Sequence, residues 1–120
     1  MFRADIYVRI TRNLFRVKNL KSGQEAQGVP ETPFTTTRML VGDFQSAQRT
    51  LKSALAQVGG ASFLAPNLLM HPLEMVEGGL SQIEERVLLE LAKGAGASKV
   101  VVFVGPALGD NEVSAKLEAE

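Results

Sequence analysis

The sequence predicts an α/β domain whose sheet mixes antiparallel and parallel strands. The N-terminal residues alternate between apolar and polar side chains, as the strands of a hairpin do. Two later segments carry apolar side chains at helical spacing, and each is followed by a short apolar run typical of a buried strand. A chain of 120 residues is large enough for one core. We therefore expect a single domain over residues 1–120, ending in a tail over 107–120 that is helical or frayed.

The N-terminal part of the chain is expected to form an antiparallel meander. Its alternating pattern places one face of the first strand, with Ile6, Val8 and Ile10, in a core. Asn13 marks the first turn, because Asn tolerates a positive φ. The expected strands cover residues 5–11, 14–19 and, at a polar edge, 24–27.

A first helix is expected after this meander. Asp43 is a strong N-cap residue, and its charge suits the positive end of a helix. A stripe of apolar residues follows it, and Gly59-Gly60 ends the helix. A short buried strand, closed by Pro72, is then expected over residues 67–71.

A second helix begins with Ser81-Gln82-Ile83-Glu84, which has the Ser-x-x-Glu form of a capping box. Ile83, Val87 and Leu91 recur every four residues and are expected to face the core. The apolar run over residues 100–104 predicts a strand that is covered on both faces, as in a parallel sheet. A meander followed by two such helix–strand crossovers is the arrangement of a ribonuclease H-like fold, used by each half of the actin-type ATPases.

The chain from about Arg38 to Pro106 resembles the first subdomain of the bacterial actin-like rod-shape proteins, the MreB family. Gly42-Asp43-Phe44 stands where a helix of that family begins with Ala-Asp-Phe. The segment from Ser81 to Val87, followed by Gly-Ala-Gly-Ala at residues 94–97, is similar to the family segment that carries its water-positioning glutamate. The resemblance implies a ribonuclease H-like fold and a role in the cytoskeleton and in rod shape.

The resemblance implies a phosphate loop in the first hairpin, with an Asp that serves the metal and a Gly. The first hairpin of this chain departs from that pattern. Arg9 aligns with the Asp and Thr11 with the Gly, and the turn is shortened to Arg12-Asn13. A chain of this length also holds at most half of a nucleotide cleft. We therefore expect no cofactor, no metal site and no enzymatic activity.

Composition narrows the classes of function. Thirteen basic and thirteen acidic residues give no net charge, which argues against a nucleic-acid partner. The absence of cysteine excludes disulfides and thiol chemistry. No apolar run approaches the roughly 20 residues of a membrane span, and the start of the chain does not resemble a signal peptide. We expect a cytoplasmic protein without stable membrane insertion, since Met1-Phe2-Arg3 offers too little apolar area for an anchor.

Three features have both a structural and a functional interpretation. Glu84 aligns with the family's water-positioning glutamate, but its place in a capping box is explanation enough. His71, the only histidine, ends a buried strand and is expected to be a core or rim residue rather than a base. Gly94-Ala95-Gly96 follows a helix rather than a strand, so it is a helix stop and not a phosphate loop.

A basic cluster on the first hairpin is the candidate interaction site, formed by Arg9, Arg12, Arg16 and Lys18. It is either an ordinary solvated face or a surface for an acidic partner. The favoured hypothesis is a non-catalytic scaffold module that binds a second copy of itself or a larger actin-like protein. The alternatives are a residual metal-dependent phosphotransfer by Glu84 with Asp5, Glu74 or Glu77, and a nucleic-acid or small-ligand binder.

Overall fold

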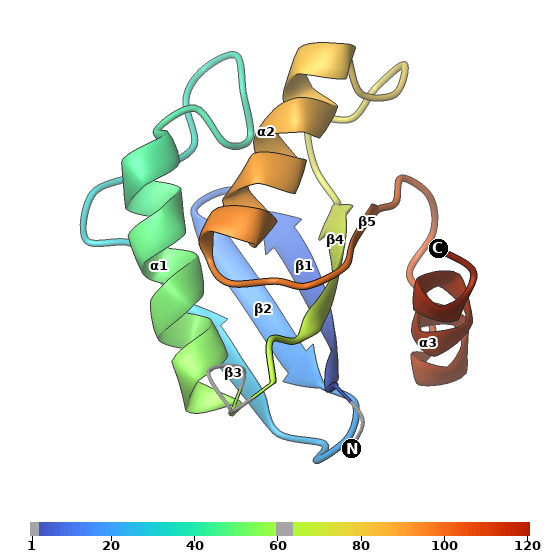
Figure 1. Cartoon of the computed structure of the whole chain (residues 1–120). Helices are drawn as coiled ribbons and strands as arrows, with labels where there is room; N and C mark the ends of the chain where they lie inside the picture. The colour runs from blue at the N-terminus through green and yellow to red at the C-terminus, as the bar shows by residue number, and fades with distance from the viewer. Residues whose placement is uncertain (1–2, 60–63) are drawn as a thin grey trace.

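The computed structural model describes residues 3–59 and 64–120 and forms a five-stranded mixed sheet with three helices (Figure 1). Met1, Phe2 and Gly60, which the sequence analysis singled out, lie outside the described residues. The strands are β1 (Asp5–Thr11), β2 (Leu14–Asn19), β3 (Glu25–Gly28), β4 (Asn67–Pro72) and β5 (Val100–Val102). The helices are α1 (Phe44–Gln57), α2 (Gln82–Gly94) and α3 (Asp110–Glu118).

The strand order across the sheet is β3-β2-β1-β4-β5. Strand β2 is antiparallel to both of its neighbours, whereas β1, β4 and β5 run parallel to one another. The predicted meander and the two helical crossovers are therefore confirmed, and so is the mixed α/β sheet. The register places Arg9 of β1 between Arg16 of β2 and His71 of β4.

Helices α1 and α2 lie next to each other on one face of the sheet (Figure 1). The alternation along β1 directs Ile6, Val8 and Ile10 to this face, where all three are fully buried. Leu51 from α1 and Leu91 from α2 pack against the same core. Burying an aliphatic side chain of this size contributes about 1.5–3 kcal/mol, so this core supplies most of the driving force for folding.

Helix α3 packs against the opposite face of the sheet (Figure 1). Val113 and Leu117 of α3 are buried against Tyr7 of β1 and Leu69 of β4. The tail is therefore helical over Asp110–Glu118, one of the two expected alternatives, because docking of these two side chains holds the helix in place. The expectation that β1 has only one buried face is incomplete, since Tyr7 is only 3% exposed.

Two further expectations are corrected at the second crossover. Strand β5 is three residues long and only half-buried, because it is an edge strand with a neighbour on one side alone. Ile83 was expected in the core but is 73% exposed. The buried positions of α2 are Leu88, Leu91 and Ala92.

The local capping and turn signals are confirmed. Asp43 accepts a hydrogen bond from the backbone N–H of Ser46 at 3.0 Å. Asn13 has a φ of 53° in the first turn, and Gly59 has a φ of 78° just beyond α1. No helix in the described part of the chain is long and apolar enough to cross a membrane.

Candidate functional site

The carboxyl ends of β1 and β4 form the edge at which open α/β sheets usually bind ligands. Here the edge is closed by contacts between loops. Glu74 accepts a hydrogen bond from the Arg12 backbone N–H at 2.6 Å and one from the Arg12 guanidinium at 2.8 Å. The backbone N–H of Asn13 donates to Thr35 Oγ1 at 2.9 Å. The cavity beneath these loops has about 20 Å³, room for about one water molecule. Its lining is mainly apolar and comprises Met39, Leu40, Val41, Pro72, Glu74, Met75, Val76, Leu80, Glu84, Val87 and Leu88.

Glu84 lies at this edge and completes the capping box of α2. Its Oε1 accepts a hydrogen bond from the Ser81 backbone N–H at 2.9 Å, while its own N–H donates to Ser81 Oγ at 3.1 Å. The predicted capping role is therefore confirmed.

Of the other acids considered for phosphotransfer, Glu74 lines the same small cavity as Glu84, whereas Asp5 and Glu77 are not among its lining residues. Asp5 begins β1 and accepts a hydrogen bond from the Asn67 amide at 3.1 Å, whereas Glu74 is paired with Arg12. Glu77 lies in the loop before α2. Among residues 3–59 and 64–120, no group of three or more His, Asp or Glu side chains is arranged to hold a metal ion.

His71 is fully buried on the α3 side of the sheet, as a core histidine was expected to be. The Gly105 carbonyl can only accept, so His71 Nε2 carries the proton and donates to it at 2.8 Å. His71 Nδ1 then accepts from the Tyr7 hydroxyl at 2.6 Å. The Tyr7 oxygen in turn accepts from the Leu108 backbone N–H at 3.3 Å.

This network joins β1 and β4 to the segment that leads into α3. The ring of Phe103 stands edge-on to His71, with 5.0 Å between ring centroids. Burial, and to a smaller extent the positive charge of Arg9, lower the pKa of His71 below 6.5, although the hydrogen bond to Gly105 opposes them. The neutral imidazole is therefore favoured in the folded protein. The role of Tyr7 was not predicted, because the sequence left residues 107–120 open between a helix and a frayed tail, and this helix covers Tyr7.

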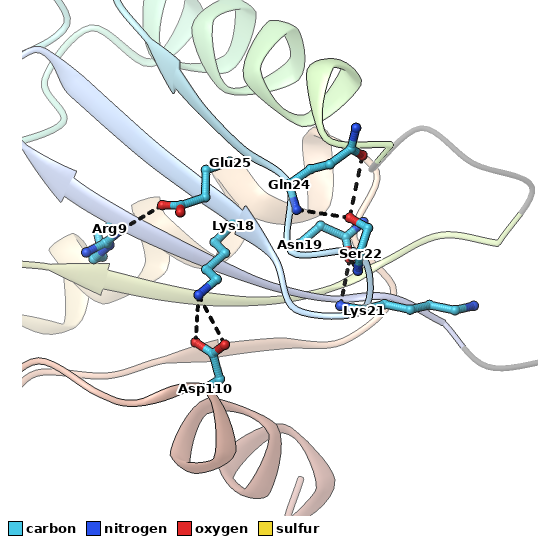
Figure 2. A network of polar contacts seen from close by, with 8 residues as sticks. All are labelled: Arg9, Lys18, Asn19, Lys21, Ser22, Gln24, Glu25 and Asp110. Atoms are coloured by element: carbon cyan, nitrogen blue, oxygen red, sulfur yellow. Dashed lines mark hydrogen bonds and ion pairs between the residues drawn. The ribbon is translucent and has the colours of Figure 1, made fainter.

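Three of the four predicted basic residues share one face of the sheet. Arg9, Arg16 and Lys18 alternate with core residues and emerge on the face that carries α3. Lys18 is paired with Asp110 at 3.1 Å, and Arg9 with Glu25 at 3.7 Å (Figure 2). Arg12 is separated from them, since it lies in the turn and binds Glu74.

A second surface was not predicted and lies over the outer side of α1 and α2. Ile83 is exposed here beside Phe44 and Val87 in an apolar groove of about 570 Å³. Arg86 and Glu90 stand on the rim of the groove and are paired at 3.2 Å. The sequence contained a signal for this surface, the apolar Ile83 in the first turn of α2. The four-residue spacing of apolar side chains led us to expect that residue in the core.

These features define a small α/β domain with an arginine-bearing sheet face and an apolar groove between two helices. No family model matches the sequence. Over 124 aligned residues the chain is 34% identical to the uncharacterized protein YjaA of Escherichia coli strain K12, and the alignment covers 94% of this chain and 96% of YjaA. The chain therefore belongs to the YjaA family.

Proposed function

We propose that this chain is a non-catalytic scaffold module that associates with a second copy of itself. Its architecture is proposed to be ribonuclease H-like and akin to the first subdomain of the MreB family. The strand order and the two helical crossovers on one face support that kinship. A role in the cytoskeleton or in cell shape follows from the same resemblance and is part of the proposal.

The exposed Ile83 in its apolar groove is the observation that carries the proposal. Large apolar side chains that gather on the surface of a small domain usually mark contacts with other proteins. Phe44 and Val87 extend the apolar surface on either side of Ile83, and the groove between them is open. A second apolar surface placed over this groove would remove all three side chains from water.

A second copy is the occupant that the charges at the groove favour. In a two-fold dimer the same surface serves both partners, so it must be complementary to itself. Arg86 and Glu90 supply one charge of each sign on the rim, and both are well exposed. A two-fold arrangement lets Arg86 of each copy face Glu90 of the other. A larger actin-like protein that presents a similar surface is the other partner class.

Sedimentation velocity over a concentration series tests the self-association. Ile83→Gln should weaken the dimer by at least about tenfold, because a central apolar contact is lost twice in a symmetric interface. Val29→Gln is the matched control, since Val29 is 71% exposed but lies in the loop after β3, away from the groove. Equal effects of the two substitutions, or a monomer at every concentration, would contradict self-association. In the second case, mixing with an actin-like protein tests the other partner class.

The hydrogen bonds of Glu84 and Glu74 support the non-catalytic part of the proposal. Glu84 caps α2 and Glu74 holds Arg12, so the two carboxylates that line the small cavity are already used in hydrogen bonds. Thermal unfolding with and without Mg²⁺-ATP tests this part. A nucleotide at 100 times its dissociation constant would stabilise the folded state by about 2.7 kcal/mol. We expect no such shift, and a clear shift would restore a phosphotransfer interpretation of Glu84.

A further inference from the structure

Two arginines lie directly opposite each other on adjacent strands, on the sheet face that carries α3. Arg9 of β1 and Arg16 of β2 are register partners in an antiparallel pair, so their side chains leave the sheet on the same side. Like charges at directly opposite positions are destabilising. The pair therefore costs stability unless negative charge is supplied nearby.

The carboxylates near the pair supply little of that charge. Asp110 is taken by Lys18, which donates to it at 3.2 Å. Glu25 reaches only Arg9, with a separation of 3.7 Å, and its side chain is 61% exposed (Figure 2). Within the described ranges no carboxylate pairs with Arg16, whose register neighbour on β3 is the neutral Gln27.

The Nε atoms of both arginines are buried and have no hydrogen-bond partner among the described residues. A buried N–H without a partner is costly, and native proteins rarely leave one unexplained. Guanidinium groups bind carboxylate and phosphate through Nε–H together with a terminal N–H, in a two-pronged geometry. An oxyanion above the pair would bind guanidinium N–H groups of both arginines and offset the repulsion between the two cations.

We propose that the Arg9–Arg16 pair is the binding site for one oxyanion group, a phosphate or a carboxylate, of a small molecule. An open cavity of about 320 Å³ adjoins Arg16 and is lined by Arg16, Glu25, Ala26 and Gln27. The cation–π contact of Arg9 with Tyr7, at 5.4 Å to the ring centroid, holds the Arg9 guanidinium in place. The loosely held Glu25 carboxylate occupies part of the anion's position and swings away when the anion binds.

This site is independent of the proposed self-association. The arginine pair lies on the α3 side of the sheet, whereas the groove with Ile83 lies on the outer side of α1 and α2. If the anion does not bind, the dimer proposal therefore still stands. If the chain does not dimerise, the anion-site proposal still stands.

Nuclear magnetic resonance of the arginine side chains tests the site. The Nε–H signals of the arginines are followed while inorganic phosphate or acetate is added to the whole chain, with sodium chloride at matched ionic strength as the reference. We expect saturable shifts at Arg9 and Arg16 and none at the exposed Arg49 of α1. The two anions separate a phosphate site from a carboxylate site, and either response supports the proposal. Equal, unsaturable shifts at all arginines, or no shift with either anion, would overturn it.

Three variants sharpen the test. Arg16→Gln should weaken the binding of the responding anion by about tenfold or more, since charge-assisted hydrogen bonds are lost. Glu25→Gln should strengthen it by about two- to fivefold, because a competing surface carboxylate is removed. Arg49→Gln should leave it unchanged. Backbone spectra establish that each variant is folded, and unchanged binding in folded Arg16→Gln would contradict the site.

Discussion

The two faces of the sheet are closed in different ways. Two helices, α1 and α2, cover the first face, and the side chains between them and the sheet form a continuous apolar core. The second face is covered by α3 alone, over β1, β4 and β5. A helix is about 10 Å wide and neighbouring strands are about 4.8 Å apart, so a single helix leaves part of a five-stranded sheet open.

The two faces differ in the kind of group that they leave exposed. On the first face the two helices cover the sheet. An apolar surface around Ile83 is exposed to water on the outer side of these helices. On the second face the uncovered part, over β2 and β3, carries Arg16, Lys18 and Glu25. Apolar association is therefore expected at the first face and charge recognition at the second.

The largest expected effects come from removing a core side chain on either face. Leu51→Ala, on the first face, should lower the free energy of unfolding by about 3–5 kcal/mol, because it leaves a cavity in the main core. Leu117→Ala, on the second face, should cost about 2–3 kcal/mol, at the low end of the roughly 2–5 kcal/mol typical of Leu→Ala, since the smaller cluster under α3 can relax. Urea denaturation measures both.

Hydrogen exchange tells the two faces apart. Leu117→Ala should speed amide exchange in α3 while the amides of β1 keep most of their protection, because the first face holds the sheet without α3. Exchange that rises equally in α3 and in β1 would mean that the two faces unfold as one unit.

A smaller loss is expected when the polar network under α3 is broken. Tyr7→Phe removes the hydroxyl that donates to His71 and accepts from Leu108, and leaves buried polar groups without partners. The free energy of unfolding should fall by about 1–3 kcal/mol in urea denaturation. Tyr7→Phe in a background that already carries His71→Phe is the control, and there the same substitution should cost less. Equal costs in both backgrounds would show that the hydroxyl does not act through His71.

Protonation of His71 should weaken the same network at low pH. The pKa of His71 is lowered in the folded protein, so between that pKa and 6.5 the unfolded chain binds more protons than the folded one. The contribution of the neutral ring is present above pH 6.5 and is lost as the pH falls below 6.5 through the folded pKa. One group gives a slope of at most about 1.4 kcal/mol per pH unit. Denaturation between pH 5 and 7 measures the slope, which should disappear in His71→Gln.

The smallest expected effect is a gain in stability. Arg16→Gln removes the cross-strand repulsion with Arg9, so the free energy of unfolding should rise by about 0.2–1 kcal/mol at low salt. Salt screens the repulsion, and the gain should shrink in salt. Thermal unfolding at two salt concentrations measures it. A loss of stability at low salt would mean that packing of the Arg16 stem outweighs the repulsion.

Elements that are specified by neighbouring residues could be predicted from the sequence. The capping box of Ser81 and Glu84, the Asp43 cap and the Asn13 turn all depend on contacts within a few residues. The alternation in β1 and β2 also located the hairpin correctly, and with it the shared face of Arg9 and Arg16.

Elements that depend on distant contacts could not be decided in this way, and the tail over residues 107–120 was left open between helical and frayed. Helix α3 has only two buried side chains, Val113 and Leu117, and it is stabilised by docking on strands far away in the sequence. The hydrogen bond between Tyr7 and His71 joins residues 64 positions apart and requires the pairing of β1 with β4.

The error at Ile83 has a geometric cause. A repeat of four residues turns by about 40° more than a full helical turn, so Ile83 lies about 80° around the helix from Leu91. It lies about 140° from Leu88, which is buried. Residues repeated every four positions therefore turn away from the core along the helix. At the N-terminal end of α2 the repeat places Ile83 on the surface, where it lines the groove.

Cross-linking through single cysteines tests most directly whether two copies meet at this groove. The chain has no cysteine, so each substitution introduces one unique thiol. Gln82→Cys places the thiol on the groove, and Ser53→Cys places it on the exposed surface of α1 outside the groove. With a short bismaleimide we expect a covalent dimer from Gln82→Cys, little from Ser53→Cys, and suppression of the first when Ile83→Gln is added. Equal cross-linking at both positions, or none at Gln82→Cys at high protein concentration, would contradict self-association through the groove.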